Sequence, residues 1–318
     1  SMNTITSPAS KKPKTILITG GTGFIGQTLC TALAKSEFQI TVLTRSPEKI
    51  KMILGDHITP FMTPLSHLPK LKTSDHFDAI INLAGAPIFA ERWTNERKKT
   101  LFHSRLEITE ELIEFISRAE SKPEVLLSGS AVGFYGDQGN SLIDETSANL
   151  KSLDGFSHHL CAEWEKAALK AKNYGVRVCL LRTGLVIGKT GGFLQPMILP
   201  FKLSLGAQLG NGQQWMPWIH MDDYIAICLL LLNNKSIEGA LNLTGPNPVT
   251  NQVFTKPLAQ SLHRPALLFA PAWVLKPLLG ERSELLLNSQ RAIPKRLLEA
   301  GFQFKFSELK PALDDVLN

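Results

Sequence analysis

The chain has 318 residues, 43% of them hydrophobic and 19% charged, which is enough to bury a substantial core and excludes disorder except at its start. Its net charge of +6 comes from dispersed basic residues that match no known module, so we expect no nucleic-acid partner. The longest unbroken apolar run, Tyr224 to Leu232, is far shorter than the roughly 20 residues that span a bilayer, so we expect no membrane association.

The first 13 residues, which begin with Ser1 before Met2, are polar and lack periodicity. We predict that they are a disordered tail or tag remnant outside the fold. The cysteines are scattered, with no Cys-x-x-Cys or Cys/His cluster, which argues against a metal site and a disulfide framework. The expected location is a reducing cytoplasm. They are Cys30, Cys161, Cys179 and Cys228.

The first predicted strand, Thr15–Thr19, runs into a glycine-rich turn and then a helix with an apolar face. Gly20 would allow the tight turn, Gly23 would let the backbone approach a pyrophosphate, and Gly26 would let the helix pack on the sheet. The pyrophosphate would then meet the helix N-terminus. A chance glycine turn is the alternative. The cofactor contacts predicted here are Gly20, Thr22, Gly23, Phe24 and Ile25.

The second predicted strand, Ile40–Thr44, ends at Arg45, which is flanked by Thr44 and Ser46. An acidic residue at this place would bind the ribose 2′-hydroxyl of NAD, whereas a guanidinium forks onto phosphate oxygens. We therefore predict NADP as the cofactor, with Thr44, Arg45 and Ser46 at its 2′-phosphate. The alternative is a solvated surface arginine.

The third predicted strand, Ala79–Ala84, ends in Leu83, Ala84 and Gly85, whose backbone we predict to lie against the cofactor. A simple tight turn is the alternative. The next predicted helix, from about Thr94 to Arg118, carries Arg105 within its apolar stripe. A charge on a buried face needs a partner, so Arg105 either snorkels or forms a salt bridge, or it reaches the cofactor or active site.

The strand Val125–Ser130 runs out to hydroxyl groups and a tyrosine. We predict that Ser128 contacts the cofactor and that Ser130 and Tyr135 are catalytic, because a hydroxyl can bind a substrate oxygen and a tyrosine can act as acid or base. Turn chemistry, with Ser and Gly capping the next element, is the alternative.

Apolar runs that alternate with helices predict an α/β fold, with a doubly wound parallel Rossmann sheet and a smaller C-terminal domain on the substrate side. We expect the NADP-binding domain at 14–184, with a further sheet strand from 240–245, and the substrate-side domain mainly at 185–318. Glycines and prolines crowd Gly184 to Pro217, which predicts loops over the strand ends. Later segments read as three helices and a short strand: Trp273 to Leu279, Ser283 to Leu287, Pro294 to Ala300, and Phe302–Phe304.

Several motifs occur in one order along the chain: T-G-G-T-G-F-I-G from Thr19, N-L-A-G from Asn82, S-G-S-A-V-G-F-Y-G from Ser128, L-R-T-G from Leu181 and W-I-H-M-D-D from Trp218. In these motifs the chain resembles the extended short-chain dehydrogenase/reductase superfamily. More narrowly, it is similar to the NAD-dependent epimerase-like family with bacterial and human members, through C-A-E-W-E from Cys161, G-P-N-P-V-T-N from Gly245 and a family-specific C-terminal segment at about 269–306.

The resemblance implies a Tyr-x-x-x-Lys pair, in which the Tyr transfers a proton and the Lys holds the ribose. Here Ser157 and Cys161 stand at those places, and neither can do the original job. The possible substitutes are Tyr135, one of His158 and His159, and Cys161. The histidines are more typical of a solvated helix start and Cys161 of a core position.

Two further features are ambiguous. Asp222 is placed as the N-cap of the helix that follows, and His220 either anchors the substrate loop, which we favour, or borders the pocket. The stretch Gly206–Trp218 offers stacking and amide groups for a polar substrate, or it is ordinary loop packing or an interface: Gln213, Gln214, Trp215 and Trp218.

We therefore expect an NADP(H)-binding epimerase or oxidoreductase-like protein, monomeric or homodimeric, that acts on a small polar or nucleotide-sugar-like substrate. The alternative is a non-catalytic NADP(H)-binding module that senses redox state or binds a partner.

Overall fold

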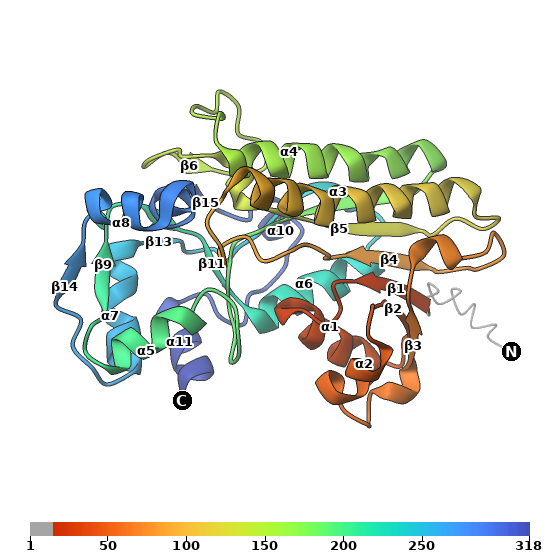
Figure 1. The fold of residues 1–318 in the computed structure, drawn as a ribbon, viewed down its shortest axis with the longest axis horizontal. Coiled ribbons are helices and arrows are strands. Elements are labelled where there is room, and N and C mark those ends of the chain that lie inside the picture. The colour runs from red at the N-terminus through yellow and green to blue at the C-terminus, as the bar shows by residue number, and fades with distance from the viewer. Residues whose placement is uncertain (1–14) are drawn as a thin grey trace, which may run out of the picture.

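The computed structural model describes residues 15–318, so the predicted tail at 1–13 lies outside the described residues. A seven-stranded sheet forms the centre of the fold (Figure 1), and every pair of neighbouring strands in it is parallel. The strand order is β12-β7-β5-β4-β1-β2-β3. The strands are β1 (Thr15–Thr19), β2 (Gln39–Leu43), β3 (Met62–Leu65), β4 (Ala79–Asn82), β5 (Val125–Ala131), β7 (Arg177–Thr183) and β12 (Gly239–Leu243). The predicted doubly wound Rossmann fold is confirmed.

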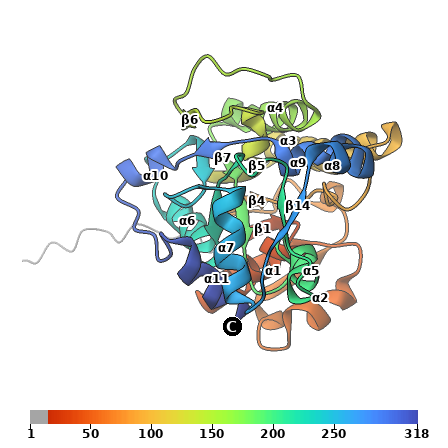
Figure 2. The same ribbon diagram turned by 90° about the vertical axis from the view of Figure 1, so that its left-hand side faces the viewer.

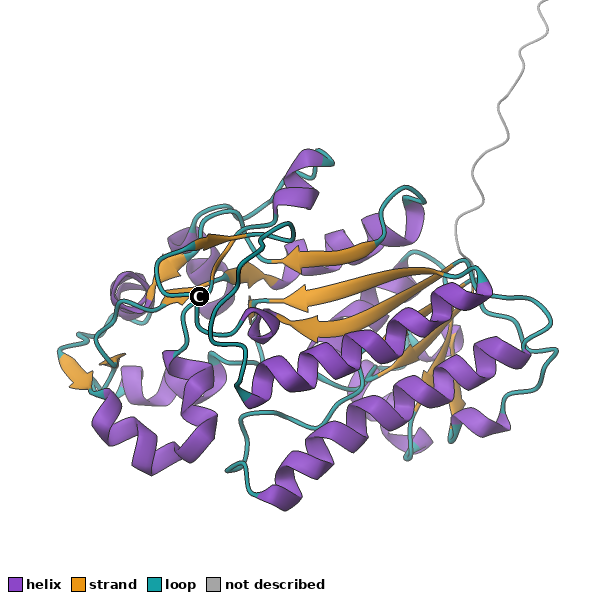
Figure 3. Cartoon of the chain, turned by 90° about the horizontal axis from the view of Figure 1, so that it is seen from above, coloured by secondary structure: helices purple, strands orange, loops and turns teal. Residues whose placement is uncertain are grey.

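Helices cover both faces of this sheet. On one face lie α1 (Phe24–Lys35), α2 (Pro47–Leu54) and α6 (Met221–Asn233), and on the other α3 (Asn95–Arg118) and α4 (Phe156–Leu169) run side by side (Figure 3). Strand β1 contributes side chains to the hydrophobic cores on both faces of the sheet, because successive side chains point to opposite faces. Ile16 and Ile18 pack with α1 and α6, whereas Leu17 packs with α3.

The long predicted helix is confirmed in α3, which spans 24 residues. It begins after Thr94, whose hydroxyl accepts a hydrogen bond from the Arg97 N–H at 3.1 Å. A threonine at this place satisfies one of the free N–H groups of the first turn, which explains why the helix starts there.

Strand β3 has no counterpart in the strands expected from sequence. Its four residues include Pro64, which breaks the apolar pattern and donates no backbone hydrogen bond. Because β3 is the edge strand, beside β2 alone, the proline is tolerated there.

The remaining strands form short pairs beyond the sheet's carboxyl edge, and Figure 2 views this part of the molecule face on. The pairs are β8 (Leu185–Ile187) with β11 (Trp218–His220), β10 (Trp215–Met216) with β13 (Val249–Thr250), β9 (Ala207–Leu209) with β14 (Leu268–Ala270), and β6 (Leu142–Ile143) with β15 (Arg291–Ala292). The helices here are α5 (Gln195–Lys202), α7 (Asn251–Ser261), α8 (Ala272–Leu279), α9 (Glu284–Leu287), α10 (Lys295–Glu299) and α11 (Leu309–Leu317). Short 3-10 helices lie at Thr59–Phe61, Leu68–Lys70, Val132–Tyr135, Lys170–Tyr174 and Gly280–Ser283.

This region has a core of its own around Trp218, Phe254 and Leu313. The segment Gly184–Pro217, which we expected to consist of loops, also contains regular elements: β8, α5, β9 and β10. The predicted strand at Phe302–Phe304 is wrong. Both phenylalanines pack against the main core, with their rings perpendicular at 4.8 Å, in a segment without strand pairing. Within residues 15–318, no helix is both long and apolar enough to cross a membrane.

Candidate functional site

The glycine turn lies between β1 and α1, against the end of β4. Gly20 has φ of +72°, and a Cβ there would lie 2.6 Å from the Leu83 carbonyl. A Cβ on Gly26 would lie 2.0 Å from the Gly20 oxygen, so that glycine lets the helix pack against the turn. The predicted tight-turn role of Gly20 is thus confirmed, whereas Gly26 admits the helix against the turn rather than against the sheet itself.

Gly23 differs from these two glycines, because the nearest atom to a Cβ there is 3.4 Å away. It is the N-cap of α1, and no side chain caps that helix. The free N–H groups of the first turn can therefore receive an anion, which is the geometry that a pyrophosphate requires.

Arg45 follows β2, the strand beside β1. Its side chain is exposed and makes no hydrogen bond or ion pair with another of the described residues. The neighbouring Thr44 hydroxyl accepts the Ser46 N–H at 3.1 Å, which holds the turn around Arg45. A free guanidinium at this place fits a 2′-phosphate.

A buried polar network that the sequence analysis missed joins the ends of β1 and β4 to the middle of β5. Asn82 at the end of β4 accepts a hydrogen bond from Thr19 at 2.6 Å and donates to Thr109 at 2.9 Å and to Ser128 at 3.3 Å. Ser128 is fully buried, so its hydroxyl serves this network. Polar residues within the apolar runs of adjacent strands were the available signal.

Arg105 holds the loop after β4. Its guanidinium donates to the Ala86 carbonyl at 3.0 Å and lies 5.2 Å from the Trp164 ring, and burial lowers its pKa to about 10. A Cβ on Gly85 would lie 2.7 Å from the guanidinium carbon. Arg105 therefore supports the backbone of Gly85 and Ala86, just after β4, whose end we predict to lie against the cofactor. It forms no salt bridge with another residue of the described range 15–318.

The two predicted catalytic side chains belong to one buried cluster around an ion pair. The Ser130 hydroxyl donates to Glu165 at 2.5 Å, and Arg182 binds both oxygens of Glu165 at 3.0 and 2.9 Å. Arg182 also donates to the Tyr135 oxygen at 3.1 Å, and the Tyr135 hydroxyl donates to Asn242 at 2.7 Å. We name Ser130, Tyr135, Glu165, Arg182 and Asn242 the interior cluster.

The hydroxyl protons of Ser130 and Tyr135 are both donated within the interior cluster, to Glu165 and Asn242. Tyr135 is 1% exposed and Ser130 is 5% exposed. Burial raises the pKa of Tyr135, and the neighbouring Arg182 offsets that rise only in part. These contacts fit a positioning role for Tyr135 at the end of β5. Glu165 and Arg182 were missed as members of the cluster, although a charged residue within an apolar strand signals a buried partner.

The other possible substitutes for the missing pair are engaged elsewhere. His158 bonds through Nδ1 to the Phe134 carbonyl at 2.5 Å, and His159 is exposed beside Phe102. Cys161 is buried, and burial raises the pKa of its thiol to about 11. Cys161 is therefore a core residue, as the sequence favours.

A carboxylate that the sequence analysis did not consider meets Ser157. Oε1 of Glu284, on α9, accepts the Ser157 N–H at 3.1 Å and its hydroxyl at 2.8 Å. No local pattern could reveal this contact, since the two residues are 127 positions apart.

The segment that carries Glu284 is also tied to the loop after β4. Arg92 donates to the Leu278 carbonyl at 2.8 Å, Lys98 pairs with Glu281 at 2.8 Å, and Arg282 donates to the Phe89 carbonyl at 2.9 Å. These contacts fasten the segment from α8 to α9 beside the carboxyl ends of β4 and β5.

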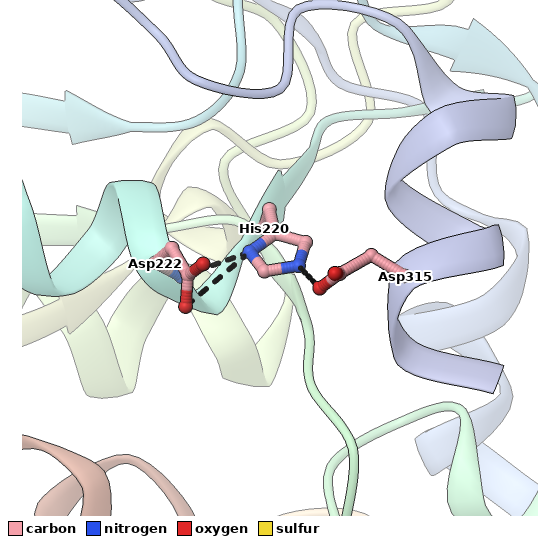
Figure 4. Close-up of side chains that lie close together, drawn as sticks. All are labelled: His220, Asp222 and Asp315. Atoms are coloured by element: carbon pink, nitrogen blue, oxygen red, sulfur yellow. Dashed lines mark hydrogen bonds and ion pairs between the residues drawn. The ribbon is translucent and has the colours of Figure 1, made fainter. Parts of the chain in front are cut away.

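His220 joins two distant helices (Figure 4). Its Nε2 donates to Asp315 of α11 at 2.8 Å, its Nδ1 accepts the Asp222 N–H at 2.9 Å, and its ring stacks on Phe306 at 4.0 Å. His220 is thus the N-cap of α6, so the predicted capping role of Asp222 is wrong; Asp222 instead pairs with Lys305 at 3.0 Å. Both ring nitrogens make hydrogen bonds, which makes His220 a structural anchor, the role that the sequence favours.

The loop residues proposed for a polar substrate divide into two groups. Trp218 and Gln214 are buried, and their N–H groups donate to backbone carbonyls. Trp215 is half-buried and Gln213 is exposed. Loop packing thus accounts for the first pair.

The parallel sheet, its glycine turn and the unpaired arginine after β2 define a Rossmann-type dinucleotide-binding protein. The chain belongs to the NAD dependent epimerase/dehydratase family, whose model matches residues 16–243. A second model, a domain of unknown function called DUF1731, matches 270–316 and overlaps the C-terminal segment expected at about 269–306. The predicted family membership is confirmed.

Individual relatives agree with this assignment. The chain is 39% identical over 313 residues to the chloroplastic epimerase family protein SDR39U1 homolog of Arabidopsis thaliana, covering 98% of this chain and 89% of that one. It is 37% identical over 305 residues to epimerase family protein SA0724 of Staphylococcus aureus, covering 96% and 99%. The crystal structure of human epimerase family protein SDR39U1 with NADPH superposes with a TM-score of 0.83 at 31% identity, covering 95% and 99%.

Proposed function

We propose that this protein binds NADP(H) across the carboxyl ends of β1, β2, β4 and β5. The observation that carries the proposal is the uncapped start of α1 beside the unpaired Arg45, which offers one site for a pyrophosphate and another for a 2′-phosphate. The similar human protein was crystallised with NADPH. The proposed cofactor contacts are Gly20, Thr22, Gly23, Phe24, Ile25, Thr44, Arg45, Ser46, Leu83, Ala84 and Gly85. Arg105 and Ser128 would support them from behind, because Arg105 binds the Ala86 carbonyl and Ser128 is fully buried.

We further propose an oxidoreductase or epimerase-like reaction on a small polar or nucleotide-sugar-like substrate. The bound dinucleotide would supply hydride exchange with a substrate carbon. Ser130 and Tyr135 would orient the substrate oxygen near the end of β5, with Glu165 and Arg182 holding both side chains in place. Residues 185–318 would provide most of the substrate side, because their short strand pairs stand beyond the carboxyl edge of the sheet, where such folds bind ligands.

A spectroscopic screen tests this reaction. Purified protein is mixed with NADPH and a panel of carbonyl compounds and nucleotide sugars, and nicotinamide absorbance is followed. We expect oxidation with at least one member, and a fall of roughly tenfold in rate for Ser130→Ala, the worth of one hydrogen bond to the substrate oxygen. Turnover that survives both Ser130→Ala and Tyr135→Phe would refute the catalytic assignment.

A non-catalytic NADP(H)-binding module is the second candidate. It is favoured by Ser157 and Cys161 at the places of the usual pair, and by the engagement of both hydroxyl protons within the interior cluster. Under this hypothesis NADPH binds, but its absorbance stays constant with every member of the panel.

A further inference from the structure

The C-terminal segment brings Glu284 to the first turn of α4. Its Oε1 accepts both hydrogen bonds from Ser157. Gly155 makes room for this carboxylate, since a Cβ there would lie 3.1 Å from Oε2. The contact thus depends on a glycine at the N-cap of α4 and on a donor two residues later.

The second oxygen of Glu284 is free. Within residues 15–318, Oε2 accepts no hydrogen bond, although a carboxylate can accept about four. The side chain is half-buried and lines a cleft of about 540 Å³, whose other charged residues are Asp137, Lys276 and Glu281. One oxygen is therefore anchored while the other remains available to a bound molecule.

Glu284 reaches the place where the wider superfamily has its reactive tyrosine. Ser157 stands at that tyrosine's position in the sequence, and its Cβ lies 3.1 Å from where a Cβ on Gly133 would be. Gly133 belongs to the 3-10 helix that directly follows β5. The carboxylate is thus held beside the strand end that carries Ser130.

We propose that Glu284 faces the reacting end of the NADP(H) site and favours the oxidised cofactor over the reduced one. This inference rests on the proposed function. The oxidised nicotinamide ring carries a positive charge and the reduced ring is neutral, so a nearby carboxylate attracts the first and not the second. A helix cap without this role would affect both forms equally.

The test measures dissociation constants for NADP⁺ and NADPH with the full chain, using calorimetry. Glu284→Gln keeps an oxygen for Ser157 but removes the charge. We expect it to weaken NADP⁺ relative to NADPH by roughly five- to tenfold, the size of one partly screened charge at close range. Glu120→Gln is the control, because it removes an exposed carboxylate just beyond the end of α3, outside this cleft; its ratio should equal that of the parent. Glu284→Asp should restore most of the parent ratio.

An unchanged ratio in Glu284→Gln, or an equal change in Glu120→Gln, overturns the inference while NADP(H) binding stands. If the parent protein binds neither form, the proposed function fails and this inference fails with it. Should Glu284→Gln not fold, Glu284→Ala removes the same charge and decides the question by the same ratio.

Discussion

Arg182 and Glu165 form a two-pronged ion pair in the interior, with Nε to Oε2 at 3.0 Å and Nη2 to Oε1 at 2.9 Å. Their side chains are only 10% and 6% exposed. Removing one partner of such a pair leaves a buried charge without compensation, and this loss exceeds the net worth of the pair itself.

We therefore predict that Glu165→Gln lowers the free energy of unfolding by about 3 kcal/mol. The substitution leaves the buried Arg182 without a charged partner and weakens the hydrogen bond that Ser130 donates. Denaturant unfolding measures the change. Glu163→Gln, two residues earlier on the same helix and outside the interior cluster, is the control and should stay within about 0.5 kcal/mol of the parent. Equal values for the two variants would contradict a stabilising pair.

Two glycines of the nucleotide turn should respond differently to alanine. Gly26→Ala places a Cβ 2.0 Å from the Gly20 oxygen, so the backbone must move and both the melting temperature and NADPH binding should fall. Gly23→Ala meets nothing closer than 3.4 Å, and φ of −76° suits alanine, so the fold should persist while NADPH binding weakens. Melting curves and NADPH titrations of both proteins check this. A Gly23→Ala protein that binds NADPH as the parent does would argue against close cofactor approach there.

Arg45 should set the preference between the two dinucleotides. Because its guanidinium is exposed and unpaired, Arg45→Ala should leave stability unchanged and reduce the NADPH-to-NADH affinity ratio by roughly tenfold, the worth of one charge-assisted hydrogen bond. Lys35→Ala removes an equal charge at the far end of α1 and serves as the control. A ratio that stays at the parental value in Arg45→Ala would refute the assignment.

The thiols should be unreactive in the folded protein. All four are buried, and burial raises the pKa of Cys161 and Cys179 to about 11 and of Cys30 and Cys228 to about 12. The thiol form is then retained well above neutral pH, and the thiolate is the reactive species. We expect negligible labelling by a thiol reagent at pH 8 and complete labelling after denaturation. Rapid native labelling of any cysteine would contradict this expectation, and only labelling of Cys161 would favour a catalytic thiol.

Local sequence patterns were sufficient to predict the Rossmann sheet. Apolar runs such as Ala79–Asn82 repeat between helices, and the glycine turn after Thr19 has a fixed spacing. Strand β3 was missed because Pro64 interrupts an edge strand that needs little apolar surface. The alternating pattern Phe302-Gln303-Phe304 led to the wrong prediction of a strand, because it is typical of strands, but both rings instead pack against the same core.

The candidate site was less predictable, because its contacts join residues far apart in the chain. Ser130 and Tyr135 stood out as hydroxyls at a strand end, but their partners Glu165 and Asn242 come from other elements. The contact between Ser157 and Glu284 leaves no periodic signal at all. Only the packing of the C-terminal segment against α4 brings those side chains together.

Titration of the purified protein with NADPH and NADH is the decisive test of the proposed NADP(H) site at the glycine turn. We predict saturable binding with one NADPH per chain, tighter than NADH by roughly tenfold or more, because one extra phosphate meets Arg45. Absence of saturable NADPH binding, or equal affinity for the two dinucleotides, would contradict the account.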